Sequence, residues 1–283
     1  MTGLIIGAII ISFSSVMVKL ADVPPDVAGF YRLVGGGLGM MVILWKMGKL
    51  KQLTAHVWKW AFLGAFFFAW DFVFWHRSID LVGPGLSTML ANFQVIVLAT
   101  VSVLFLKEKV SRTFLVAIPM ALIGLYLMVG VQWTSFTPDY RLGVIFGLLA
   151  ALAYALYLLS LKYSLSKAGA DPLAMAAGVA LLTGLLLGAL AMAQSNSFAI
   201  PNTKSLLALT ALALICHATG WYLITRGIQL VDTSLVGLIL LLQPTLSFVW
   251  DLLFFGKPTN PVELTGVALA LLAIYLGSLK REK

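Results

Sequence analysis

Asp71 lies in the middle of a long apolar stretch and is surrounded along the chain by aromatic residues and a histidine. Its neighbours within about one helical turn are Trp70, Phe74, Trp75 and His76. A carboxylate beside aromatic rings can bind an ammonium group, while the rings stack on it or on an apolar side chain. It can also carry a proton, or it can be a structural group paired with a polar residue of another helix. Because ionised side chains are costly in apolar surroundings, Asp71 is a functional candidate.

Other polar side chains stand at similar depths in apolar stretches. The imidazole of His217 suits a proton relay or a hydrogen bond to a substrate, although a lone helical histidine also serves in plain packing. The amides of Asn92, Gln94 and Gln243 need hydrogen bonds that hydrocarbon cannot give, so they bond across helices or line a cavity. The remaining candidates are one hydroxyl and three aromatic side chains, namely Ser15, Tyr154, Tyr157 and Trp221.

The composition indicates that these candidate residues lie in a protein surrounded by lipid. The 283 residues are 61% hydrophobic and only 11% charged, whereas a soluble domain carries about 25% charged residues. So few polar side chains cannot cover a surface that faces water. Basic residues in cytoplasmic loops account for the net charge of +8, so nucleic acid is not an expected partner. The single cysteine, Cys216, excludes an intrachain disulfide.

Ten apolar segments are long enough to span a bilayer, which takes about 20 residues per helix. We place them at 3–20, 26–47, 58–79, 82–105, 112–130, 141–164, 172–194, 204–229, 231–254 and 262–280. The N-terminus has no basic region before its apolar run, which predicts a retained first helix. If that end is cytoplasmic, roughly two thirds of the 19 Lys and Arg residues fall on the inside. We therefore expect both termini in the cytoplasm.

The later part of the chain repeats the earlier part. Residues 77–127 align without a gap on residues 226–276, at a constant shift of 149. The informative matches pair uncommon residue types, namely Arg77 with Arg226, Gln94 with Gln243 and Tyr126 with Tyr275. Since five is an odd number of spans, the second copy enters the membrane from the opposite side. We predict two inverted five-helix repeats, residues 1–134 and 135–283, as in many secondary transporters; chance similarity of apolar segments is the alternative.

Three stretches follow one another in an order and spacing that one family shares. They are Phe13-Ser14-Ser15-Val16 with Pro24-Pro25 and Phe30-Tyr31-Arg32, then Phe105-Leu106-Lys107-Glu108-Lys109 with Gly124-Leu125-Tyr126, and last Gln243-Pro244-Thr245. On these motifs the chain resembles the drug/metabolite transporter superfamily, in its EamA-type branch of two five-helix units, over nearly its whole length. The second copy departs from the pattern, because Gly256-Lys257-Pro258 stands where the first has Lys107-Glu108-Lys109.

The resemblance implies a secondary transporter of the bacterial inner membrane that works by alternating access to a central midplane cavity. Within the branch, the chain is most similar to bacterial exporters of aromatic and other neutral amino acids. Proton-coupled efflux of cationic drugs and exchange of another metabolite are the alternatives within transport. An embedded enzyme or a receptor is the alternative outside it, but the three histidines are scattered and form no metal-ligand pattern. No GxxxxGK[ST] loop is present, so we expect no use of ATP.

The candidate side chains are expected to face this cavity. The predicted substrate-binding residues are Ser15, Trp70, Asp71, Phe74, His76, Asn92, Gln94, Tyr154, Tyr157, His217, Trp221 and Gln243. The expected partners are a small-molecule substrate, an amino acid in the first place, and the lipid bilayer. We expect a monomer with no catalytic residue, metal or cofactor.

Overall fold

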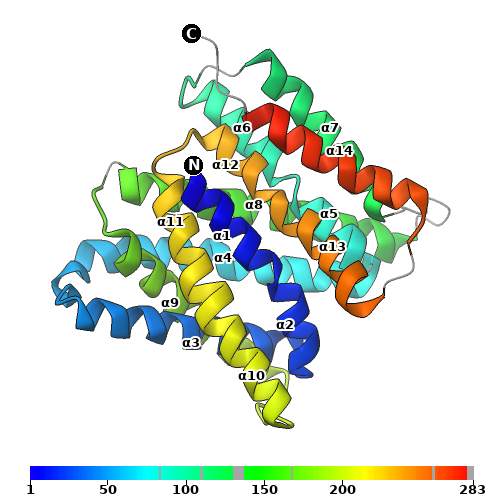
Figure 1. Ribbon diagram of the computed structural model, residues 1–283. Helices are drawn as coiled ribbons and strands as arrows, with labels where there is room; N and C mark the ends of the chain where they lie inside the picture. The colour runs from blue at the N-terminus through cyan, green and yellow to red at the C-terminus, as the bar shows by residue number, and fades with distance from the viewer. Residues whose placement is uncertain (83, 109–110, 130–136, 167, 257–258, 279–283) are drawn as a thin grey trace. The chain divides into compact units, whose positions relative to one another are not determined.

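The computed structural model describes residues 1–82, 84–108, 111–129, 137–166, 168–256 and 259–278. All regular structure within these residues is helical, as the sequence predicts (Figure 1). The α-helices are α1 Thr2–Ser12, α2 Ser14–Ala21, α3 Pro25–Lys46, α4 Ala55–Val82, α5 Pro84–Ala91, α6 Gln94–Leu104, α7 Arg112–Val129, α8 Pro138–Ser166, α9 Pro172–Ala193, α10 Thr203–Ala211, α11 Tyr222–Ile228, α12 Thr233–Leu240, α13 Leu242–Phe255 and α14 Pro261–Ser278. A short 3₁₀ helix, η1 Leu50–Gln52, and a π-helix, η2 Leu212–Trp221, complete the set.

Singly or joined end to end, these helices form long apolar segments, which makes the chain an all-α membrane protein. In the described residues, seven helical segments are long and apolar enough to cross a membrane: Thr2–Ala21, Pro25–Lys46, Ala55–Val82, Pro138–Ser166, Pro172–Ala193, Thr203–Ile228 and Thr233–Phe255. The shorter apolar helices are Gln94–Leu104, Arg112–Leu127 and Pro261–Gly277. All of these fall on the ten expected segments. Because a straight span takes about 20 residues, the count of ten spans stays a prediction.

The helices group into two compact units. Unit 1 consists of Met1–Ala69 and Tyr157–Leu230, and unit 2 consists of Trp70–Leu156 and Val231–Lys283. Each unit therefore combines segments from the earlier and the later part of the chain. Helices α4 and α8 contribute residues to both units.

In unit 1, helix α3 packs closely against α9 through glycines of α9. A Cβ atom on Gly184 would lie 2.8 Å from Val34 Cγ2 and 3.0 Å from the Val34 backbone nitrogen. A Cβ atom on Gly188 would lie 2.6 Å from Cδ2 of Phe30. Small residues let membrane helices approach until their backbones touch, and van der Waals packing then holds them together.

In unit 2, helices α7 and α14 make the corresponding close pair. A Cβ atom on Gly124 would lie 2.7 Å from both the Ala270 nitrogen and the Gly266 carbonyl oxygen. The core beside this crossing includes Phe114, Leu125, Leu238, Leu241 and Ile274, all of them buried. The two backbones thus meet at Gly124, with larger apolar side chains filling the remaining space.

Two pairs of helices in unit 2 have bounds that differ by the shift at which the sequence repeats. Helix α7 begins at Arg112 and ends at Val129, and α14 begins at Pro261 and ends at Ser278, each 149 residues later. Helices α5 and α12 are also offset by 149 residues at both ends, and each is followed by a break and a second helix. Breaks of this kind leave backbone carbonyls free within an apolar segment, where only protein or an aqueous cavity can satisfy them.

Side chains explain two of the interruptions in the spans. Between α1 and α2, Ser12 Oγ donates to the Ile9 carbonyl oxygen at 2.6 Å, immediately before the break at Phe13. Between α5 and α6, Asn92 Nδ2 donates to the Thr88 carbonyl oxygen at 2.8 Å. Such bonds compete with the helical ladder and bend or end a helix.

Glu108 holds the first turn of α12 from a distant part of unit 2. Its Oε1 accepts the backbone N–H of Thr233 at 3.1 Å, and its Oε2 accepts the N–H of Ser234 at 3.4 Å and the hydroxyl of Ser102 at 2.6 Å. Asp232, at the N-cap position of α12, makes no side-chain cap bond. Glu108 therefore supplies the negative group that the start of a helix favours.

The Glu108→Gln substitution is expected to destabilise the folded protein by about 1–3 kcal/mol, because a neutral amide loses the charge and cannot accept these bonds with both of its polar atoms. The unfolding midpoint in detergent, measured against denaturant concentration, checks this value. Glu263→Gln is the matched control, since the Glu263 carboxylate bonds, within the described part of the chain, to Thr259 and Asn260 of its own turn. Equal losses in the two variants would contradict a special role for Glu108.

Candidate functional site

A group of four buried rings, the ring cluster, lies in the core of unit 1. Its members are Phe68 of α4, Tyr157 of α8, and His217 and Trp221 of η2. Phe68 stacks on Tyr157 with centroids 4.4 Å apart, and Trp221 meets these rings edge-on at 5.4 and 5.7 Å. The His217 ring lies 6.1 Å from that of Trp221. Edge-to-face and offset contacts of this kind are the favoured geometries for aromatic rings.

The π-helix η2 sets the positions of His217 and Trp221. In a π-helix the backbone hydrogen bonds span five residues where those of an α-helix span four. The Thr219 hydroxyl likewise donates to the carbonyl oxygen of Leu214, five residues earlier. On α3, Gly36 leaves no room beyond its backbone, because a Cβ atom there would lie 2.7 Å from His217 Cδ2. Segments of π-helix are rare and occur often at functional sites.

Three polar atoms in this part of unit 1 are buried without a hydrogen-bond partner among the described residues. They are Nδ1 of His217, Nε1 of Trp221 and Oγ of Ser14, in side chains that are 2%, 4% and 8% exposed. A buried polar atom without a partner costs free energy, so such groups are uncommon and call for an explanation. All three can donate a hydrogen bond to a ligand.

Arg32 of α3 brings a positive charge to the same region. Helix α3, which carries Arg32, and helix α2, which carries Ser14, both pack against η2. The unpartnered nitrogens of His217 and Trp221 belong to the ring cluster, so hydrogen-bonding atoms and an apolar surface adjoin in one core.

Several predicted residues lie in unit 2 and form a separate arrangement there. Trp70 stacks on Phe74 at 5.1 Å, and Phe74 stacks on Phe146 of α8 at 6.1 Å. Arg77 lies over the Phe146 ring, 5.7 Å from its centroid. Asp71 is half-buried, and its carboxylate has no hydrogen bond or ion pair with the residues that the structure describes. A carboxylate in this setting can receive a cation or a proton.

The other ring-bearing candidates of unit 2 are His76 and Tyr154. The His76 ring lies 5.9 Å from that of Phe72 and 5.4 Å from that of Trp75, and all three residues are half-buried on α4. Tyr154 of α8 is also half-buried. His76 therefore sits among aromatic rings of its own helix.

The three predicted amide side chains differ in their hydrogen bonds. Asn92 bonds within its own helix, to Thr88. Gln94 is fully buried, and its Nε2 donates to the Gly237 carbonyl oxygen of α12 at 3.4 Å, while its Oε1 has no partner in the described residues. Gln243 likewise has a buried Nε2 without such a partner. Gln94 and Gln243 thus retain unused hydrogen-bonding capacity, as a cavity-lining role requires.

The sequence suggests Ser15 as the serine of the site, but the structure buries the hydroxyl of its neighbour Ser14 instead. Ser15 Oγ donates to the Ser12 carbonyl oxygen at 3.2 Å, so its hydroxyl is used locally. Ser14 is buried and unpartnered among the described residues. A signal was available, because Ser15 stands four residues before the exposed Lys19 and shares a helical face with it. Phe68, which sequence reasoning also missed, has no such signal in its aromatic-rich stretch.

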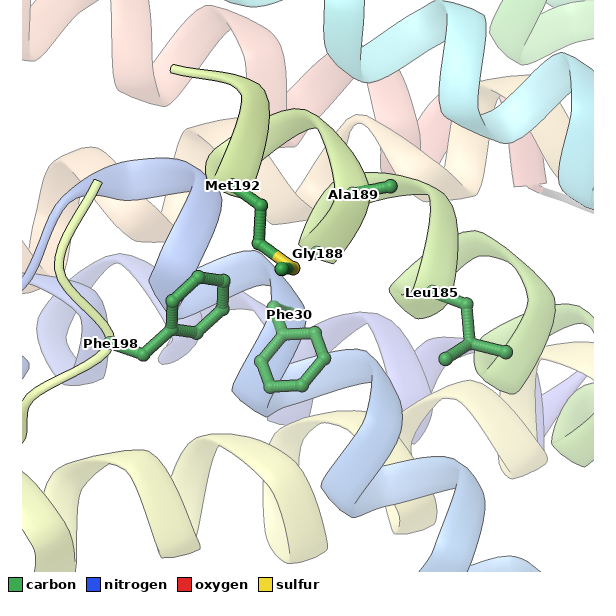
Figure 2. Close-up of a pocket in the computed structure, with 6 residues that line it drawn as sticks. All are labelled: Phe30, Leu185, Gly188, Ala189, Met192 and Phe198. Atoms are coloured by element: carbon green, nitrogen blue, oxygen red, sulfur yellow. The ribbon is translucent and has the colours of Figure 1, made fainter. Parts of the chain in front are cut away.

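An apolar pocket of about 400 Å³ also lies in unit 1, between α3, α9 and the segment before α10 (Figure 2). It is lined by Phe30, Leu185, Gly188, Ala189, Met192 and Phe198. Tyr31 fixes one wall by donating its hydroxyl to the Phe198 carbonyl oxygen at 2.7 Å. The lining offers apolar contact alone, so this pocket lacks the donors that polar recognition needs. Among the described residues, no three His, Cys, Asp or Glu side chains are placed to hold a metal ion.

The sequence matches the family profile described as "EamA-like transporter family" over residues 1–130 and 141–279. The chain belongs to the EamA-like transporter family. This family is part of the drug/metabolite transporter superfamily, and membership makes the chain a multi-pass membrane transporter. The superfamily assignment expected from the motifs is therefore confirmed.

Two further likenesses accompany this EamA-family match. A curated relative is "Uncharacterized transporter YwfM" of Bacillus subtilis (strain 168), 24% identical over 256 residues, which cover 88% of this chain and 83% of the relative. A solved crystal structure matches the fold with a TM-score of 0.83 at 19% identity, and the match covers 98% of this chain and 97% of that one. The EamA-type helical fold thus extends over essentially the whole chain.

Proposed function

We propose that this EamA-family transporter exports aromatic and other neutral amino acids by alternating access through a cavity at the membrane midplane. The observation that carries the proposal is the ring cluster with its unpartnered His217 and Trp221 nitrogens. Aromatic faces stack on an aromatic or apolar substrate side chain, and the nitrogens bond to its polar end. The site then requires that the helices of unit 1 part to admit the substrate and close behind it.

The proposed architecture is the pair of inverted five-helix repeats, residues 1–134 and 135–283. Its support is the 149-residue offset between α7 and α14 and between α5 and α12, together with the two family matches over 1–130 and 141–279. Inverted repeats allow a transporter to open alternately to either side. The proposed setting is the bacterial inner membrane with both termini in the cytoplasm, where the basic loops favour them. The chain acts as a monomer without a catalytic step.

Reconstitution into liposomes tests the substrate class. Vesicles loaded with radiolabelled phenylalanine, tryptophan, leucine, glutamate, an aliphatic amine or a sugar are diluted, and efflux is followed over time. We expect saturable efflux of phenylalanine, tryptophan and leucine, and none of glutamate or the sugar above protein-free vesicles. Absence of flux for every amino acid would overturn the proposal.

Proton-coupled efflux of cationic drugs is the second candidate, and Asp71 is the observation that favours it. Asp71 is half-buried on α4, the helix that carries the Trp70–Phe74 ring pair, and its carboxylate has no partner in the described residues. Under this candidate, an imposed pH gradient drives uptake of an aromatic cation, and Asp71→Asn abolishes the effect of the gradient. If Asp71→Asn leaves amino acid flux and its pH dependence unchanged, the second candidate falls.

A further inference from the structure

We infer that a groove at the end of α3 binds an anionic phospholipid, with the lipid phosphate between Lys46 and Arg226 and an acyl chain in the groove. The inference goes beyond the proposed function, because it depends on the chain being a membrane protein and not on what the chain transports. The site lies within unit 1 and uses no residue of the ring cluster.

The groove lies between the end of α3, the start of α9 and the segment where η2 passes into α11. Its volume is about 130 Å³, below the roughly 300–1,000 Å³ of a site that encloses a whole small molecule. It is lined by Ile43, Met47, Leu173, Ala218, Thr219 and Tyr222. Ile43 and Met47 are 45% and 54% exposed on a membrane-spanning helix, so the groove adjoins the surrounding lipid. A small, mostly apolar groove in this setting suits a segment of an acyl chain.

The two main walls of the groove run in the same direction. A Cβ atom on Gly36 of α3 would lie 2.8 Å from the carbonyl oxygen of Ala213 in η2. Farther along both segments, Met47 of α3 and Tyr222 of α11 line the groove together. The last turns of α3 and α11 therefore lie at the same end of the groove.

Each wall carries a basic residue at this end. Lys46 follows the lining residue Ile43 by three positions on α3, and Arg226 follows Tyr222 by four positions on α11. Residues three or four apart share a helical face, so both basic residues stand about one turn beyond the groove. Both are exposed. An apolar groove that ends between two positive charges matches a lipid with an anionic head and a hydrocarbon chain.

The chain turns directly after Lys46, which keeps a further positive charge nearby. Gly48 has a φ of 66°, and the N–H of Lys49 donates to the Leu44 carbonyl oxygen at 2.8 Å. A residue in the left-handed region followed by such a bond is a common way to end a helix. Lys49 is exposed and is held beside the last turn of α3.

Acidic residues do little to neutralise these charges. Residues 27–70, which include α3 and the connection to α4, contain no Asp or Glu. At the α9 wall, Asp171 uses its Oδ1 to accept the backbone N–H groups of Leu173 and Ala174, at 2.9 and 3.1 Å. That carboxylate caps α9. The basic end of the groove therefore favours an anion, and the apolar groove beside it favours a lipid over free phosphate.

A lipid titration tests the inference. Purified protein in a neutral detergent is titrated with phosphatidylglycerol, with phosphatidylcholine of the same acyl chains, and with glycerol phosphate, which has the anionic group but no chain. The rise in melting temperature gives the half-saturating concentration, and native mass spectrometry counts the lipids retained. A basic residue near an anionic surface adds about fivefold in affinity, so we expect phosphatidylglycerol to bind at least roughly tenfold more tightly than phosphatidylcholine. Glycerol phosphate is expected to have no saturable effect.

Charge variants locate the phosphate. The double variant Lys46→Gln/Arg226→Gln is expected to lose the preference for phosphatidylglycerol, whereas Lys46→Arg/Arg226→Lys keeps both charges and the preference. Arg141→Gln/Lys204→Gln is the matched control, because it removes two positive charges at exposed positions outside the groove. It is expected to keep the preference, which separates a local site from the net charge of the protein.

A second pair of variants locates the acyl chain. Ile43→Trp fills the groove and is expected to weaken phosphatidylglycerol binding about fivefold or more, although every basic residue remains. Val42→Trp is the control, since Val42 is 47% exposed on the same turn but does not line the groove. Both positions are exposed, so folded protein is expected from each variant.

Three results would overturn the inference. The first is equal binding of phosphatidylglycerol and phosphatidylcholine to the unaltered protein. The second is an undiminished preference in folded Lys46→Gln/Arg226→Gln. The third is an effect of glycerol phosphate as large as that of phosphatidylglycerol, which would make the site one for a free anion.

Discussion

Replacing Trp221 by alanine is expected to lower the initial rate of phenylalanine flux at least tenfold. Trp221 contacts three other rings, Phe68, Tyr157 and His217, and its nitrogen has no partner in the described residues. The substitution removes both the stacking surface and a donor, and a loss of about 1.4 kcal/mol in transition-state binding corresponds to a factor of ten. Counterflow in liposomes, expressed per folded molecule, measures the change.

Two further variants separate binding from stability, because truncating a buried tryptophan also destabilises the core by about 3–5 kcal/mol. Trp221→Phe keeps most of the packing and removes only the nitrogen donor, so it is expected to raise the KM for phenylalanine with a smaller effect on the maximal rate. Trp45→Ala is the control, since Trp45 is 65% exposed on α3. Normal flux kinetics in a folded Trp221→Phe variant would remove Trp221 from the proposed site.

Replacing Gly124 by valine is expected to destabilise the protein by about 3 kcal/mol or more, enough to deplete the folded form. Even the Cβ atom would lie 2.7 Å from backbone atoms of Ala270 and Gly266 on α14. Backbone atoms cannot rotate away as a side chain can, so α7 and α14 would have to separate along their whole contact. The melting temperature in detergent and the yield of monodisperse protein measure the loss.

Gly3→Ala provides the comparison for Gly124. A Cβ atom on Gly3 would meet only the Leu223 carbonyl oxygen, at an ordinary contact distance of 3.8 Å. This variant is therefore expected to keep the melting temperature of the unaltered protein. An equally mild effect of Gly124→Val would mean that α7 and α14 do not pack as closely as the structure indicates.

The positions of the helices could be predicted from the sequence because they follow from simple physics. An apolar run must satisfy its backbone internally in lipid, and a helix does so within the run itself. The segment expected at 172–194 accordingly appears as Pro172–Ala193. The breaks within spans were harder to predict, because the break at Phe13 goes with local hydroxyl bonds from Ser12 and Ser15 to backbone carbonyls. The π-helix η2 packs against Gly36 of α3, a neighbour that is distant in the sequence.

The candidate site was only partly predictable. Tyr157, His217 and Trp221 were chosen for residue type, and the structure places them together in unit 1. Phe68 completes that cluster, but one phenylalanine among many in α4 is distinguished only by what packs against it. Trp70, Asp71 and Phe74 were chosen on the same grounds and belong to unit 2. The residue type was enough to select candidate side chains, but which of them lie together depends on the tertiary packing.

The make-up of unit 1 from Met1–Ala69 and Tyr157–Leu230 has a consequence for biosynthesis. Helix α3 leaves the ribosome long before α9, the helix whose glycines it packs against, and at cellular translation rates the interval is roughly ten seconds or more. During that time the surface of α3 that later meets α9 faces lipid or the insertion machinery. Completion of either core must await the later part of the chain, so a ribosome that stalls early leaves an inserted chain whose packing surfaces remain unmatched.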